Sequence, residues 1–228
     1  TRSYGDFGSN IFALVLGVPD DRYDDVVATL KHEISVKYDN HLNTGIFGTQ
    51  FFFETLALNG LNDLAYNAMN QEDFPSFGNW IKQGATVTWE KWNGADSRNH
   101  PMFGGGLTWF YRILAGVNVD ADKPAYEHII IKPILDKRLP EVYYSHMTPY
   151  GKVVSEIKQT GRNLEMNVTV PVGSTATIYI PVGGRTSEVT ESGTSVRDSK
   201  DVRFEGIQDG NYVVHVPQGQ YKFKVDNQ

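Results

Sequence analysis

The sequence predicts an α+β multidomain protein in which a helical first part precedes an antiparallel β-sandwich. Apolar residues recur at helical spacing up to about residue 117, and from about residue 118 short β-rich runs alternate with turn residues. The length of 228 residues is enough for two small domains. We therefore predict a helical domain over residues 1–117 and a β-sandwich domain over residues 118–228.

Six helices are expected in the first domain. In the second of them, Val26, Leu30 and Ile34 fall on one helical face, and Asp20 and Asp21 provide an N-terminal cap. Several of these segments are apolar on more than one face, which indicates helices that are packed on both sides. The expected ranges are 11–16, 22–38, 48–58, 61–70, a short helix opened by Pro75, and 107–115.

The second domain is expected to consist of short strands separated by turns. Turn signals recur about every ten residues, as in a β-sandwich. The run 164–170 also alternates between apolar and polar residues, so one of its faces should be buried. The expected strands are 128–131, 152–157, 164–170, 176–180, 212–216 and 221–225. The expected turns are 160–163, 172–174, Gly183-Gly184, Asp209-Gly210 and Gln218-Gly219.

Composition excludes several classes of function. The formal net charge of -6 and the lack of a basic run argue against nucleic acid or an anionic membrane as partner. The chain has no cysteine, which excludes disulfides and thiolate metal sites. No apolar run approaches the roughly 20 residues of a membrane span. No metal-ligand spacing, phosphate-binding loop or dinucleotide motif is present, so neither a metal nor a cofactor is expected.

The stretch from Thr86 to His100 carries the most specific chemistry. Glu90 lies between Trp89 and Trp92 and precedes His100 by ten positions, in a segment expected to be a loop. Indole faces can cover the apolar face of a sugar ring, and a carboxylate can act at its anomeric carbon. The alternative is structural: the indoles belong to the core, Glu90 is a surface acid and His100 caps a helix.

Other polar residues are expected to have simpler roles. A glycosylation signature at Asn167 lies inside a predicted strand and is discounted. The remaining expectations are a helix cap for Asp6, capping or packing for His41, a buried and paired side chain for Glu54, and loop positions for Asp73 and Asp96.

Six segments, taken in order, resemble a known family over most of the chain. They are 41–49 (HLNTGIFGT), 73–78 (DFPSFG), 84–92 (GATVTWEKW), 97–104 (SRNHPMFG), 114–117 (LAGV) and 171–176 (PVGSTA). With them the chain resembles the C-terminal part of bacterial α-L-rhamnosidases of glycoside hydrolase family 78. A frequent arginine of that family is Lys91 here, which keeps the charge but not the bidentate fork.

The resemblance implies part of an (α/α)6 barrel followed by a β-sandwich. It also implies hydrolysis of terminal α-L-rhamnosides, or of rhamnose-containing polysaccharides, with inversion. Such a reaction uses an acid and a base roughly 6.5–9.5 Å apart. The general base of the family maps onto Glu90, and the histidine that contacts rhamnose maps onto His100. Trp89 and Trp92 would shape the pocket.

The general acid of the family lies earlier in the barrel, and its motifs are absent from these 228 residues. The chain also starts without methionine. We therefore expect residues 1–117 to be the C-terminal half of a catalytic barrel that is inactive alone and partners with the N-terminal half. Apolar helix faces left uncovered would favour self-association. The family suggests a periplasmic or secreted enzyme, with a cytoplasmic location left open.

Two alternatives remain from the sequence. The chain could be a non-catalytic carbohydrate-binding module that uses Trp89, Trp92 and His100 as a sugar platform. It could also belong to a hydrolase with the same barrel that acts on another sugar.

Overall fold

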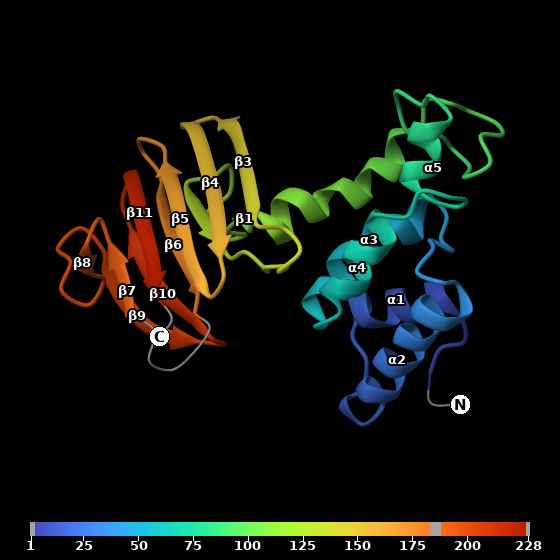
Figure 1. The fold of residues 1–228 in the computed structure, drawn as a ribbon, viewed down its shortest axis with the longest axis horizontal. Helices are drawn as coiled ribbons and strands as arrows, with labels where there is room; N and C mark the ends of the chain where they lie inside the picture. Colours follow the sequence, from blue (N-terminus) through green and yellow to red (C-terminus); the bar gives the residue numbers. More distant parts are fainter. Residues whose placement is uncertain (1–2, 183–187, 227–228) are drawn as a thin grey trace. The chain divides into compact units, whose positions relative to one another are not determined.

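The computed structural model describes residues 3–182 and 188–226 (Figure 1). The chain divides into two compact units, Thr1–Trp109 and Phe110–Gln228. The first is helical and the second contains two β-sheets, so the predicted fold class is confirmed. The domain border at residues 117 and 118 stays a prediction.

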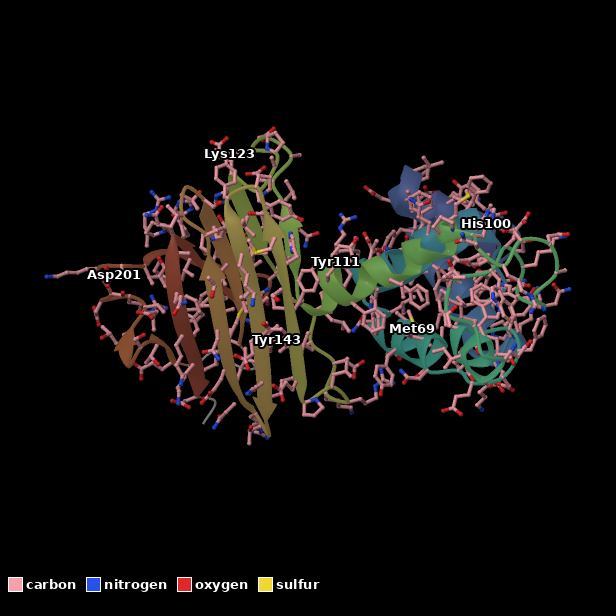
Figure 2. The ribbon with its side chains drawn as sticks, turned by 90° about the horizontal axis from the view of Figure 1, so that it is seen from above. Met69, His100, Tyr111, Lys123, Tyr143 and Asp201 are labelled. Carbon is pink, nitrogen blue, oxygen red and sulfur yellow. The ribbon has the colours of Figure 1, made fainter. Side chains whose placement is uncertain are left out.

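The helical unit is organised around α3, which contacts α1, α4 and η2. Asp6 caps α1 by accepting a hydrogen bond from the backbone N–H of Ser9 at 3.3 Å, as expected from the sequence. η2 directly follows His100, which is labelled in Figure 2. The elements are α1 (Phe7–Leu16), α2 (Asp20–His32), η1 (Glu33–Lys37), α3 (Ile46–Leu58), α4 (Asn62–Met69), α5 (Phe77–Lys82), η2 (Pro101–Leu107) and η3 (Trp109–Leu114).

Two helix predictions need correction. α2 begins at Asp20, so Asp20 and Asp21 lie in its first turn, where their charge favours the helix dipole, rather than capping it. The predicted helix over 107–115 is instead π-helical over Trp109–Leu114, and a 3-10 segment that was not predicted, Pro101–Leu107, precedes it. The 3-10 segment packs closely against α3 at Gly105, where an added Cβ would lie 3.0 Å from Cα of Gln50. Only glycine permits so close an approach.

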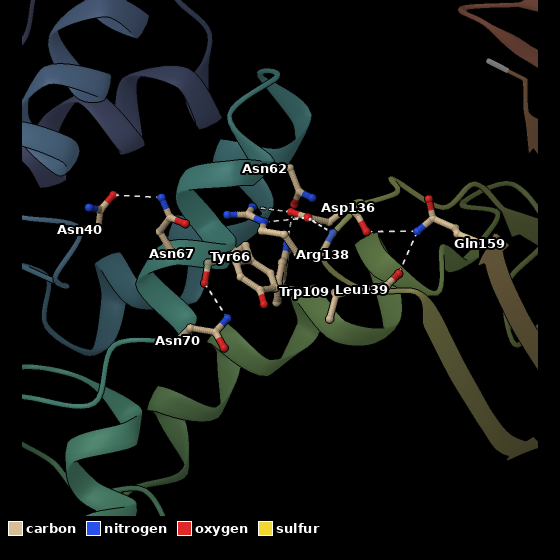
Figure 3. Close-up of polar contacts among 10 residues, drawn as sticks. All are labelled: Asn40, Asn62, Tyr66, Asn67, Asn70, Trp109, Asp136, Arg138, Leu139 and Gln159. Carbon is tan, nitrogen blue, oxygen red and sulfur yellow. Dashed lines mark hydrogen bonds and ion pairs between the residues drawn. The ribbon is translucent and has the colours of Figure 1, made fainter. Parts of the chain in front are cut away.

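Buried aromatic rings and a few polar contacts hold the helical unit together. Phe52 packs against Phe53 with ring centroids 4.9 Å apart. The indole N–H of Trp109 donates to Oδ1 of Asn62 at 2.8 Å (Figure 3). The Asn67 amide donates to Oδ1 of Asn40 at 3.4 Å, which ties the loop after η1 to α4 (Figure 3). That loop leads directly into the candidate site.

The second unit is a sandwich of two sheets. One sheet has the strand order β1-β2-β6-β10-β9 and the other β3-β4-β5-β11-β7-β8. Neighbouring strands are antiparallel except β2 and β6, which are parallel. The strands are β1 (Val117–Val119), β2 (His128–Ile131), β3 (Glu141–Thr148), β4 (Gly151–Thr160), β5 (Asn163–Val170), β6 (Thr175–Pro181), β7 (Glu188–Glu191), β8 (Thr194–Ser195), β9 (Arg203–Gln208), β10 (Asn211–Val216) and β11 (Gly219–Asp226).

The alternation of the sequence decides which side chains fill the sandwich. On β5, Leu164, Met166, Val168 and Val170 are buried while the residues between them are not, which confirms the predicted one-sided strand. All six predicted strands are present, and β1, β3, β7, β8 and β9 are additional. The turn predicted at Gly183-Gly184 lies outside the described residues.

Candidate active site

The chain between α5 and η2 is a loop that folds back on itself. The backbone N–H of Glu90 donates to the carbonyl oxygen of Ser97 at 2.8 Å, and that of His100 donates to the carbonyl oxygen of Thr88 at 2.8 Å. The Thr88 hydroxyl returns a hydrogen bond to the carbonyl oxygen of His100 at 2.7 Å. These contacts place Glu90 and His100 side by side although ten positions separate them.

The Glu90 carboxylate is held on one side only. Its Oε2 accepts a hydrogen bond from the backbone N–H of Ser97 at 3.1 Å and lies 3.9 Å from Nδ1 of His100. Its Oε1 has no hydrogen-bond partner in the described part of the chain. The side chain is 36% exposed, so solvent or a ligand can reach it.

His100 presents a second unsatisfied atom. Its Nε2 is buried and has no hydrogen-bond partner among residues 3–182 and 188–226. Buried polar atoms are nearly always partnered in folded proteins, because leaving one unpaired costs free energy. Because the atom has almost no exposed surface, a ligand hydroxyl or a water molecule would reach it only after a shift of the neighbouring groups.

The two indoles beside Glu90 lie in different environments. Trp89 is only 4% exposed and packs with Trp80 and Phe103, and the Arg98 guanidinium lies 4.7 Å from its ring centroid. An indole covered in this way offers no free face to a sugar. Trp92 is half-buried and stacks on Trp80 with centroids 4.5 Å apart. Which indole contacts a sugar stays a prediction, and burial favours Trp92.

An open cavity of about 430 Å³ lies in front of Glu90 and Trp92. This volume is in the range of small-molecule sites. The indole N–H of Trp92 donates to the carbonyl oxygen of Thr44 at 2.8 Å, which joins two segments that line the cavity. The lining residues are Leu42, Asn43, Thr44, Gly45, Phe74, Pro75, Glu90, Lys91, Trp92, Asn93 and Phe103.

Two of the wall segments are joined by His41 and Asp73. Nε2 of His41 lies 2.8 Å from Oδ1 of Asp73, and its Nδ1 lies 3.1 Å from the carbonyl oxygen of Tyr38. Because both ring nitrogens face acceptors, the geometry suits an imidazolium. Burial alone would lower the pKa of His41, but the hydrogen bonds to Asp73 and Tyr38 outweigh it and the pKa is raised. The hydrogen bond to His41 in turn lowers the pKa of Asp73.

Sequence reasoning did not pair these two residues. It assigned His41 to capping or packing and Asp73 to a loop, and 32 positions separate them. Neither residue has a local signal that could have indicated the pair, since only the tertiary fold brings the two segments together.

The loop between α5 and η2 has internal contacts of its own. Lys91 forms an ion pair with Asp96, and their hydrogen bond raises the pKa of Lys91. Arg98 donates from Nε to the carbonyl oxygen of Gly94 at 3.2 Å. A Cβ at Gly94 would lie 2.8 Å from the Trp89 ring, and its φ of +73° also favours glycine. The loop is therefore fixed in shape around the buried indole.

The remaining sequence candidates lie elsewhere. Glu54 is half-buried on α3, and Asn167 lies in β5, where its amide donates to Oε2 of Glu156 at 2.9 Å. Within the described ranges, no group of three or more His, Asp or Glu residues could hold a metal ion. Among the same residues, no helix has both the length and the apolar character needed to cross a membrane.

Comparison with known families matches both parts of the chain. Residues 5–114 match the bacterial alpha-L-rhamnosidase 6 hairpin glycosidase domain. Residues 116–195 match the bacterial alpha-L-rhamnosidase C-terminal domain. The two matches follow each other in the order of the helical and sandwich parts.

Individual relatives agree with the family matches. An alpha-L-rhamnosidase from Formosa agariphila is 26% identical in an alignment of 225 positions, which covers 95% of this chain and 23% of the relative. The solved alpha-L-rhamnosidase from Dictyoglumus thermophilum has a TM-score of 0.88 and 32% identity, covering 99% of this chain and 26% of that one. The Streptomyces avermitilis alpha-L-rhamnosidase complexed with L-rhamnose has a TM-score of 0.83 and 26% identity, and the match covers 96% of this chain and 21% of that one. The chain thus spans about a quarter of the length of these proteins.

Proposed function

Because the chain belongs to the bacterial α-L-rhamnosidase family, we propose that it carries the general-base side of an active site that hydrolyses terminal α-L-rhamnosides. One observation supports this most strongly. Glu90 faces a cavity with one oxygen fixed by Ser97 and the other free. A general base needs this arrangement, since the free oxygen must accept a proton while the carboxylate keeps its orientation.

The proposed reaction is a single displacement with inversion. Oε1 of Glu90 accepts a proton from a water molecule as the water oxygen bonds to the anomeric carbon of rhamnose. The bond to the leaving oxygen breaks on the opposite face, where a carboxylic acid donates a proton. The Ser97 N–H and His100 hold Oε2 in place during this step.

The neighbouring side chains would bind the sugar. We assign Nε2 of His100, once a shift of its neighbours exposes it, to a hydroxyl of rhamnose, and the ring of Trp92, which lines the cavity, to an apolar face of the sugar. Trp89 shapes the pocket from the core, because its burial leaves it behind the loop rather than in the cavity. All three roles are proposals derived from burial and hydrogen bonding.

The general acid is proposed to lie outside these 228 residues. Glu90 is the only carboxylate among the described residues that line the cavity. Acid assistance commonly contributes a factor of roughly 100 to 10,000 in rate. We therefore expect no measurable hydrolysis by the 228-residue chain alone, and full activity only with the remainder of the barrel, its proposed partner.

Two measurements test the proposal. The product of the full-length enzyme on an aryl α-L-rhamnoside, followed by proton NMR, should appear first as the β-anomer of rhamnose; an α-anomer formed first would contradict inversion. The purified 228-residue chain, assayed on the same substrate at high concentration, should release no aryl alcohol. Release of aryl alcohol by the isolated chain would refute the proposal that the general acid lies outside these 228 residues.

A carbohydrate-binding module is the second candidate. The cavity with Trp92 and a single carboxylate would suit sugar binding without catalysis. Calorimetric titration of the isolated chain with L-rhamnose separates the two: millimolar or tighter binding favours the module, and no binding favours an incomplete catalytic site.

A hydrolase specific for another sugar is the third candidate, and screening the full-length protein on aryl glycosides distinguishes it. Self-association of the chain is checked by its mass in solution.

A further inference from the structure

A second cavity, of about 550 Å³, lies on the six-stranded sheet of the sandwich, where three turns meet. The turns join β3 to β4, β5 to β6, and β10 to β11. The side chains that matter here are Tyr150, Lys152, Thr169, Val172, Gln218 and Gln220. They come from β4, β5, β11 and the adjoining turns, and these three strands are neighbours in the sheet. We call this cavity the turn pocket.

The turn pocket is preformed by contacts between its turns. The backbone N–H of Gly173 donates to Oε1 of Gln218 at 2.8 Å and so joins two of them. The Tyr221 hydroxyl donates to the carbonyl oxygen of Pro217 at 2.9 Å. A Cβ at Gly173 would lie 3.0 Å from the Tyr150 ring, so the ring rests closely on this turn. A site fixed in this way loses little entropy when it binds a ligand.

The pocket combines an aromatic ring with unused hydrogen-bonding groups. Tyr150 is 39% exposed and Val172 is 75% exposed, which leaves apolar surface at the rim. The side chains of Thr169 and Gln220 make no hydrogen bond to another described residue. An aromatic face beside amides and a hydroxyl suits the alternating apolar and hydroxyl surfaces of a sugar.

Lys152 adds a positive charge that no carboxylate neutralises in the described ranges. The Lys152 ammonium lies near Tyr143 on β3, which is labelled in Figure 2. The pKa of Tyr143 is lowered mainly by the hydrogen bond between Tyr143 and Ser145, and in addition by the charge of Lys152. No Asp or Glu lines the turn pocket. This is unlike the chain as a whole, whose formal net charge is -6. The local charge therefore favours an anionic ligand.

We propose that the turn pocket binds an acidic saccharide, with the sugar ring against Tyr150, its hydroxyls on Gln218 and Gln220, and its carboxylate or sulfate on Lys152. This inference goes beyond the proposed hydrolysis and does not depend on Glu90. The sandwich would then hold a charged glycan chain, in addition to whatever the helical unit binds.

The test is calorimetric titration of the 228-residue chain with three probes of matched length: trigalacturonate, a sulfated galactose trisaccharide and neutral maltotriose. We expect binding of at least one acidic probe, ten-fold or more tighter than of maltotriose, and weakening with added salt. The two acidic probes distinguish a carboxylate from a sulfate ligand. No binding of either acidic probe, or equal affinity for maltotriose, overturns the proposal.

Variants locate the site. Lys152→Gln should remove the preference for acidic probes, and Gln220→Ala and Tyr150→Ala should each weaken binding about ten-fold. Lys158→Gln is the matched control, since Lys158 lies on the same strand but is already paired with Glu141 and Glu156. Gln220 is exposed, so its variant should fold even if the Tyr150 variant does not. Unchanged affinity in the Lys152 and Gln220 variants overturns the assignment to this pocket.

Discussion

The indole N–H of Trp92 donates to the carbonyl oxygen of Thr44 at 2.8 Å and thereby joins two walls of the cavity in front of Glu90. The two residues are 48 positions apart, so this bond is a tertiary constraint. It fixes the indole in one orientation, as the proposed stacking of Trp92 on a sugar requires.

Trp92→Phe should lower both stability and substrate affinity. It leaves the Thr44 carbonyl unpaired, at a cost of about 1–3 kcal/mol, and the ring loses its anchor. Trp109→Phe is the matched control, because it also loses an indole hydrogen bond of 2.8 Å but Trp109 does not line the cavity. Both variants should lower Tm, and only Trp92→Phe should raise KM of the full-length enzyme. An equal KM in the two variants would exclude a binding role for Trp92.

Gly94→Ala should destabilise the loop between α5 and η2 more than backbone strain alone explains. Gly60→Ala is the comparison, since Gly60 has a similar φ of +75° but nothing within 4 Å of its added Cβ. We expect Gly60→Ala to cost about 1 kcal/mol, mostly from its positive φ. Gly94→Ala should lower the free energy of unfolding by about 1–3 kcal/mol more than Gly60→Ala does, because the added methyl group meets the Trp89 ring. Urea unfolding of both variants measures the difference, and equal costs would contradict the packing described for Trp89.

The His41–Asp73 pair should make stability depend on pH. The pKa of His41 is raised above its ordinary 6.5, so its contribution is complete below that value and is lost as the pH rises through the raised pKa. The pKa of Asp73 is lowered from 3.8, so its contribution is lost only when the pH falls through that lower value. The pair therefore stabilises the folded chain most between about pH 4 and 6.5.

Thermal unfolding of Asp73→Asn checks this directly. The Tm difference between the native chain and this variant should be larger at about pH 5.5 than at about pH 8.5. Glu72→Gln serves as control, because Glu72 pairs with a lysine, Lys82, and not with a histidine. A Tm difference that is the same at both pH values would show that His41 is not charged in the folded chain.

Local sequence signals predicted most of the fold. The helices with strong apolar spacing and the strands with clear alternation are present. The additional strands β7 and β8 are four and two residues long and lie at one end of their sheet, where little periodicity can develop. The 3-10 segment after His100 escaped prediction because the close approach of Gly105 to Gln50 is a tertiary constraint.

The site was predicted in part. Placing Glu90 in a loop required only its flanking glycine and threonine residues, and the loop is present. The different burial of Trp89 and Trp92 could not be predicted, because both indoles have the same local surroundings in the sequence. The fold brings Arg98 over the ring of Trp89, whereas Trp92 lines the cavity.

The most direct test of the central claim is the turnover of Glu90→Gln in the full-length enzyme, measured beside Glu72→Gln. The glutamine can still accept the Ser97 hydrogen bond, so folding and Tm should be retained, but it cannot take a proton from water. We predict that kcat falls by a factor of roughly 100 to 10,000 or more, with KM nearly unchanged and the Glu72 variant fully active. A kcat for Glu90→Gln close to that of the native enzyme would contradict the assignment of Glu90 as the general base.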